Sequence, residues 1–117
     1  MNTPETTRSG RARSIAARCS LCALEELVQK GSIVGNKELE SIVGGMLDID
    51  DWEQCPMPPD GVARWKRVLA RCLDDMEAAG MVSSCEDGWR ICNAGKAAFA
   101  EFSCDPAGLI LHISRML

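Results

Sequence analysis

Residues 58–102 read PPDGVARWKRVLARCLDDMEAAGMVSSCEDGWRICNAGKAAFAEF, and they hold the clearest structural pattern of the chain. Over 61–79, large apolar residues recur every three or four positions and therefore share one side of a helix. These residues are Val62, Trp65, Leu69, Cys72, Leu73 and Met76. Asp60 is the expected N-cap, and Gly80 is the expected left-handed residue after the last turn. The pattern predicts a helix over 61–79 with one packed face.

Two short, partly β-branched segments, 81–85 and 89–92, follow this helix. The pair Asp87-Gly88 lies between them, and such a pair favours a tight β-hairpin. A further helical segment is expected over 93–102. A long helix, a hairpin and a short helix in this order predict a winged helix-turn-helix, which is a mainly α fold of the α+β class with a two-stranded wing.

The first half of the chain predicts two further helices. The first runs over 15–30 and stops at Gly31. The second runs over 36–43 and is expected to end at Gly44-Gly45.

A long connection, 46–59, separates this second helix from the helix over 61–79. Its acidic part, 46–53, is expected to form a short helix or a strand, which would add to the hairpin. The following residues, 55–59, read CPMPP, and prolines at this density predict no regular structure. The connection is longer than the turn of about 3–4 residues that joins the helices of a simple helix-turn-helix.

A set of residues in the second half of the chain is shared with a known type of domain. The set comprises Trp65, Val68, Leu69, Leu73, Ala79, Gly80, Met81, Val82, Gly88, Trp89, Arg90, Ile91, Gly95 and Lys96. It resembles the N-terminal winged-helix domain of Mrr-type restriction proteins and, more loosely, small bacterial winged-helix regulators. The resemblance implies a winged-helix fold but no nuclease activity, because the sequence ends soon after the last predicted helix.

Length and composition are typical of one small globular domain. The chain has 117 residues, of which 46% are hydrophobic, so it can bury a sizeable core. We expect a flexible basic arm over 1–13, the winged-helix domain over 14–104, and an apolar C-terminal segment over 105–117. Because the last segment is too apolar for a free end in water, it is expected to fold back or to form a dimer.

The cysteine count and the start of the chain indicate the expected compartment. Seven cysteines are present, but the polar and basic residues 1–14 lack the apolar segment of a signal peptide. We therefore expect a cytoplasmic protein with reduced thiols. No membrane association is expected, because no apolar run approaches the roughly 20 residues of a membrane span.

Basic residues on the predicted long helix and near the hairpin are the candidate contacts to nucleic acid. They are Arg64, Lys66, Arg67, Arg71, Arg90 and Lys96. Arginine and lysine bind phosphates, and arginine also forms paired hydrogen bonds with guanine. Against this role stand the net charge of −4 and the acidic hairpin tip, Glu86-Asp87. In the alternative interpretation the basic row is a solvated helix face with intrahelical ion pairs, such as that of Arg71 with Asp74 or Asp75.

Two functions therefore remain open at the level of sequence. The first is a transcriptional regulator that binds double-stranded DNA, with a homodimer formed by the C-terminal segment. The second is an acidic winged-helix module that binds a protein, such as a mobile-element protein that inhibits a host nucleic-acid enzyme. The residues expected to contact that partner are Asp48, Asp50, Asp51, Trp52 and Glu53.

The sequence contains no recognisable catalytic or cofactor-binding motif. The chain has no nucleophile motif, no phosphate-binding glycine loop and no histidine with a nearby carboxylate. Cys19 and Cys22 have the spacing of two zinc ligands, but no second pair of that spacing follows. We expect no enzyme activity, no cofactor and no metal site.

Overall fold

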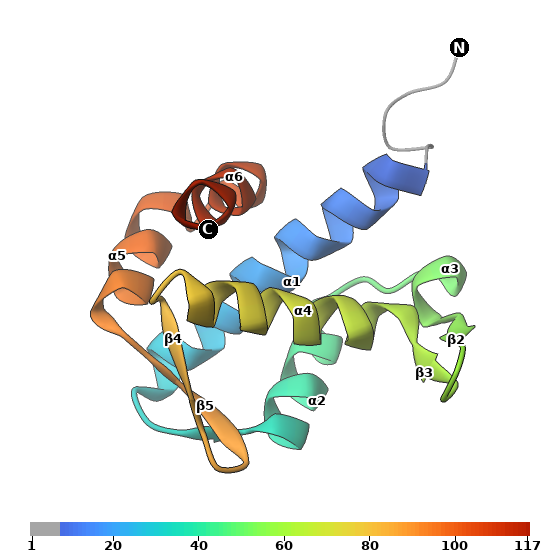
Figure 1. Ribbon diagram of the computed structural model, residues 1–117, viewed down its shortest axis with the longest axis horizontal. Coiled ribbons are helices and arrows are strands. Elements are labelled where there is room, and N and C mark those ends of the chain that lie inside the picture. Colours follow the sequence, from blue (N-terminus) through green and yellow to red (C-terminus); the bar gives the residue numbers. More distant parts are fainter. Residues whose placement is uncertain (1–7) are drawn as a thin grey trace.

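The computed structural model describes residues 8–117, with side chains from Ser14 onward. Helices form most of this part, and short antiparallel strands form two small sheets (Figure 1). The elements are α1 (Arg8–Lys30), β1 (Val34–Gly35), α2 (Asn36–Met46), α3 (Asp51–Gln54), β2 (Pro56–Met57), β3 (Val62–Ala63), α4 (Arg64–Ala78), β4 (Val82–Cys85), β5 (Gly88–Ile91), α5 (Asn93–Phe102) and α6 (Pro106–Met116). The predicted class, a mainly α fold of the α+β type, is confirmed.

Helix α1 is the central helix of the fold, and it begins at Arg8 rather than at the predicted residue 15. Its side chains Ile15, Cys19, Leu24 and Leu27 are fully buried. The helix packs against α2, α4, α5 and α6, and Figure 1 shows α4 crossing it. Buried side chains on several sides of a helix are typical of a helix that packs against several neighbouring elements.

The predicted flexible arm, residues 1–13, overlaps this helix. Its backbone is helical from Arg8, whereas residues 1–7 lie outside the part that the structure describes.

The predicted hairpin is confirmed as β4 and β5, which pair antiparallel. Cys85 pairs with Gly88, so Glu86 and Asp87 form a two-residue tip. Glu86 takes a positive φ of 24° there, as the tight turn of a short hairpin requires.

A third strand, β1, was not predicted from the sequence. It pairs with β5, Val34 opposite Trp89, and gives a three-stranded sheet of order β1-β5-β4. The indole Nε1 of Trp89 donates a hydrogen bond of 2.7 Å to Oδ1 of Asn36, the first residue of α2. This bond ties the sheet to the start of α2.

Helix α2 continues through Gly44 and Gly45 to Met46, so the predicted end at these glycines is wrong. Gly44 faces the ring of Trp65, and a Cβ at Gly44 would lie 2.9 Å from Cη2 of that ring. The glycine serves close packing of α2 on α4 rather than helix termination.

The proline-rich segment does form regular structure, contrary to expectation. Strands β2 and β3 pair as a two-stranded ribbon, with Pro56 opposite Ala63 and Met57 opposite Val62. A proline is tolerated there because a two-stranded ribbon has free edges that need no N–H donor. The ribbon is a separate sheet and does not add to the hairpin, while the acidic part before it forms the short helix α3.

Helix α4 starts at Arg64 instead of residue 61, because Val62 and Ala63 belong to β3. Asp60 is not its N-cap, since that position is held by Ala63 without a side-chain hydrogen bond. The far end is as predicted: Gly80 has a φ of 77°, and its N–H donates to the Glu77 carbonyl at 2.9 Å.

The C-terminal segment folds back on the domain as helix α6. Asp105 caps it, accepting a 3.0 Å hydrogen bond from the Gly108 N–H. Leu109 and Ile113 are buried in the core, whereas Leu111 is 55% exposed. One face of α6 therefore packs, and its exposed residues include Leu111 and Met116 as well as Ser114 and Arg115.

A helix that crosses a lipid bilayer needs about 20 predominantly apolar residues. Within residues 8–117, none of the helices combines the length and the apolar character that a membrane span requires.

We predict opposite effects from two glycine-to-alanine changes. Gly95→Ala should lower the free energy of unfolding by about 3 kcal/mol, because its Cβ would meet the Met81 carbonyl oxygen at 2.2 Å. Gly45→Ala should raise it by about 0.5–1 kcal/mol, because that site in α2 is open on all sides. Urea unfolding of both variants measures the difference, and equal effects would contradict the described packing of α5.

Candidate nucleic-acid interface

The six predicted contact residues do not form one surface. Four of them, Arg64, Lys66, Arg67 and Arg71, lie on α4. Strand alternation places Arg90 on the face of the sheet opposite Trp89, whose ring contacts α2. Lys96 lies on α5, at the other end of α4 from the β2–β3 ribbon (Figure 1). The six residues were grouped in the sequence analysis only because all of them are basic.

Arg64 is held by the segment that precedes α4. Its Nε donates a hydrogen bond of 3.2 Å to the Trp52 carbonyl, and its Cζ lies 4.1 Å from the centroid of the Trp52 ring. This is a cation–π contact in addition to a hydrogen bond. Trp52 is half-buried under Arg64, so it is not the freely exposed contact residue that the alternative function requires.

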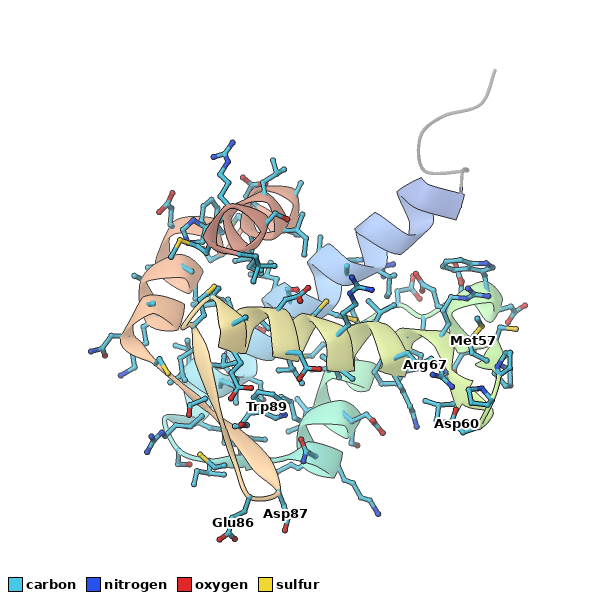
Figure 2. The ribbon with its side chains drawn as sticks, viewed as in Figure 1. Met57, Asp60, Arg67, Glu86, Asp87 and Trp89 are labelled. Carbon is cyan, nitrogen blue, oxygen red and sulfur yellow. The ribbon has the colours of Figure 1, made fainter. Side chains whose placement is uncertain are left out.

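Arg67 is held by the β2–β3 ribbon. Its Nη2 donates to the Met57 carbonyl at 3.3 Å and also to the Asp60 carboxylate. Figure 2 shows Met57 and Asp60 beside Arg67 at the start of α4. Because Nε of Arg67 is buried without a partner, only Nη1 is left for an outside acceptor.

The other two cations of α4 are more open. Nζ of Lys66 lies 3.4 Å from Oε1 of Glu40 on α2, and both side chains are 40% exposed. Arg71 is exposed and makes no ion pair with any residue that the structure describes, so the expected pairs with Asp74 and Asp75 are not found. Lys66 and Arg71 are the predicted residues best placed to bind an external anion.

An open cleft of about 410 Å³ lies between α2 and the start of α4. Its lining residues are Lys37, Glu40, Ser41, Gly44, Ile49, Gln54, Trp65 and Lys66. A second hollow of about 260 Å³ reaches from Glu40 to Trp89, so the depression follows much of the contact between the two helices. Lys37 belongs to this face but was not predicted, because only the packing of α2 beside α4 brings it near Lys66.

The acidic segment is only partly available to a partner. Glu53 is 4% exposed, and its carboxylate forms an ion pair of 2.5 Å with Arg18 of α1. Glu53 also forms a capping box with Asp50, with hydrogen bonds of 2.8 and 3.1 Å. Asp48, Asp50 and Asp51 remain exposed. The predicted acidic partner surface is therefore smaller than the sequence suggested.

The acidic hairpin tip lies away from the start of α4. Figure 2 shows Glu86 and Asp87 at the free end of the hairpin, well separated from Arg67 and Asp60. Repulsion from this tip would act on an anion bound near the hairpin more than on one bound at the start of α4.

A carboxylate on α4 also binds the first strand of the hairpin, at Ser84, two residues before Glu86. Oε2 of Glu77 accepts hydrogen bonds from the Ser84 hydroxyl at 2.6 Å and from the Ser84 N–H at 3.0 Å. The Ser84 hydroxyl, followed by its N–H, lowers the pKa of Glu77 below the ordinary value of 4.5.

The buried cysteines Cys19 and Cys72 have weakly acidic thiols. Burial, followed by the neighbouring thiols of Cys72 and Cys22, raises the pKa of Cys19 to about 12. Burial also raises the pKa of Cys72, whose thiol donates to the Ala16 carbonyl at 3.4 Å. Such thiols are weak nucleophiles. Among the described residues no cysteine is in a disulfide, and no group of histidine, cysteine and acidic residues could hold a metal.

Comparison of the chain with known protein families, sequences and structures identifies no related protein. No family model matches the chain, and no match is found among curated proteins or solved structures. The resemblance to the winged-helix domain of Mrr-type proteins therefore stays a prediction.

We predict that the buried ion pair between α1 and α3 contributes more to stability than an exposed pair on the same helix. Arg18→Met should lower the free energy of unfolding by about 3 kcal/mol, because it leaves the buried Glu53 carboxylate unpaired. Lys30→Met should cost less than about 1 kcal/mol, because its pair with Glu38 is exposed and 3.8 Å long. Chemical denaturation of both variants tests this, and equal losses would argue against a structural role for Arg18.

We predict a pH-dependent contribution from Glu77. Because its pKa is lower in the folded state, its stabilising effect is complete above about pH 4.5 and is lost as the pH falls through the folded pKa. The difference in unfolding free energy between the wild type and Glu77→Gln should therefore be largest at neutral pH and shrink in acid. Ser84→Ala removes one of the two donors and should give a smaller difference. A pH-independent difference in stability would contradict the described hydrogen bonds.

Proposed function

We propose that this protein is a winged-helix DNA-binding protein that acts as a transcriptional regulator. The observation that carries the proposal is the exposed face of α4, which presents Lys66, at the cleft to α2, and the exposed side chain of Arg71. In a helix-turn-helix, the second helix of such a pair lies in the major groove of DNA.

The order of elements supports this assignment. Helices α2 and α4 are followed by the hairpin of β4 and β5, and β1 pairs with the second strand of that hairpin. This is the order expected for a winged helix, with α4 as the recognition helix and the hairpin as the wing. The ribbon and α3 are inserted between the two helices, where a simple helix-turn-helix has a short turn.

The geometry narrows the proposed contact set. At 100° per residue, Lys66 and Arg71 lie about 140° apart and so mark the two edges of the exposed face of α4. Cations at the edges of a recognition helix suit the two phosphate backbones that border the major groove. Lys37 on α2 adds a third cation beside Lys66. In the free protein Arg64 and Arg67 hold the inserted segment.

The second candidate is a protein-interaction module, such as an inhibitor of a nucleic-acid enzyme. The net charge of −4 favours it, as does the engagement of three α4 cations in contacts within the chain. Asp48, Asp50 and Asp51 are the residues of the acidic segment that remain exposed for such a partner.

We further propose a cytoplasmic homodimer. Free cysteines suit a reducing compartment. Leu111, Met116 and Leu117 are more than half exposed on or just after α6, and a second copy of this helix would cover them. Two linked domains would also strengthen binding to paired half-sites.

We predict weak, salt-sensitive binding to a random-sequence DNA duplex, measured by fluorescence anisotropy between 50 and 200 mM salt, with a Kd of roughly 10⁻⁴–10⁻⁶ M. The double variant Lys66→Ala with Arg71→Ala should bind more weakly, and the slope of log K against log salt should fall by about 2. The reason is the loss of two cations that contact phosphate.

The matched control is Lys30→Ala with Arg115→Ala, which removes the same charge from the last turns of α1 and α6. It should keep the slope of the wild type. If the wild type does not bind at the lower salt concentration, the DNA-binding proposal is wrong and the protein-interaction module is favoured. Equal losses in both double variants would reject α4 as the interface.

A further inference from the structure

Arg67 lies within the face of α4 that the proposed function assigns to DNA, about 100° from Lys66 and about 40° from Arg71. On the helical wheel it lies between Lys66 and Arg71, which mark the edges of that face. An arginine within this face of a recognition helix is well placed to reach base edges, where it makes paired hydrogen bonds. Arg67 is therefore the residue from which the strongest base contact is expected.

The guanidinium of Arg67 is, however, already engaged inside the chain. Nη2 serves both the Met57 carbonyl and the Asp60 carboxylate, and Nε is buried. Paired hydrogen bonds to a base or a phosphate need two neighbouring N–H groups of the fork, and one nitrogen of each such pair is occupied or covered. The free protein thus lacks a free arginine fork at Arg67, near the start of α4.

The pair of Asp60 with Arg67 is open to exchange. The Asp60 side chain is 59% exposed and that of Arg67 is 37% exposed, so water and other anions reach both. Exposed ion pairs contribute little to stability, and an incoming phosphate can replace the carboxylate. Asp60 also accepts a 3.2 Å hydrogen bond from the Val62 N–H, which keeps its carboxylate in position in the turn of the ribbon.

We propose that Asp60 is an affinity-determining residue of the DNA interface, which occupies Arg67 in the free protein and competes with nucleic acid for it. This inference rests on the proposed DNA-binding function and adds a regulatory element to it. Binding would release the carboxylate of Asp60 from Nη2 of Arg67 and replace it with a phosphate or a base acceptor. The ribbon would then set how tightly α4 binds DNA without contacting the duplex through its own cations.

The variant Asp60→Asn tests the inference. Its amide oxygen still accepts from the Val62 N–H, so the turn is preserved while the charge is removed. In duplex-binding titrations it should bind about two- to fivefold more tightly than the wild type. The salt slope should become steeper by about 0.9, because one more cation is available to phosphate.

Two controls separate competition for Arg67 from a general change of charge. Glu101→Gln raises the net charge equally but lies on α5, and it should bind like the wild type. In an Arg67→Gln background, Asp60→Asn should give no gain, because the cation it releases is gone. If Asp60→Asn binds no more tightly than Glu101→Gln, or if its gain persists without Arg67, the inference is overturned.

A measurement without DNA distinguishes failure of this inference from failure of the proposed function. The nitrogen-15 NMR signal of Nε of Arg67 can be followed while inorganic phosphate is added. It should respond at lower phosphate concentration in Asp60→Asn than in the wild type. If no variant binds duplex but this difference appears, the DNA-binding function is wrong and the competition by Asp60 stands. If neither duplex nor phosphate distinguishes the two proteins, Asp60 does not control Arg67.

Discussion

The burial of α1 is the constraint on which the rest of the structure depends. Ile15, Cys19 and Leu27 are completely removed from water, and four other helices pack around this one. Burial of apolar surface is the main driving force of folding, so removal of α1 would expose the inner faces of α2, α4, α5 and α6 at once. The position of α4, and with it the proposed interface, is therefore set by packing on its far side.

Charged and polar contacts help to attach the inserted segment between α2 and α4. Arg18 binds Glu53, Arg64 stacks on Trp52, and Arg67 binds the ribbon. Each of these contacts involves an arginine that would be expected to bind DNA if charge alone were considered. The same residues thus explain why a long insertion stays folded and why the start of α4 is less basic than its sequence indicates.

Local features of the fold could be predicted from the sequence, whereas features that depend on distant contacts could not. The end of α4 before Gly80 and the hairpin of β4 and β5 were predicted from residues adjacent in the sequence, and both predictions are confirmed. Strand β1 was missed because it is two residues long and exists only through its pairing with β5. Gly44 was read as a helix stop because the close approach of Trp65 has no signature in the residues around it. The candidate site was predicted by residue type, but its partners Glu40 and Asp60 belong to other elements.

The acidic character of the chain need not prevent binding to DNA, since the field at an interface depends on nearby charges. Screening at physiological salt limits exposed charges to a range of about 8 Å. The hairpin tip lies away from the start of α4, so its two carboxylates weigh less there than Glu40 and Asp60. For a DNA-binding role these two acids matter because they form ion pairs with Lys66 and Arg67, two cations that a bound duplex would contact. A duplex must then offer better acceptors than the protein's own carboxylates, which weakens binding to phosphates alone and leaves a larger share of the affinity to base contacts.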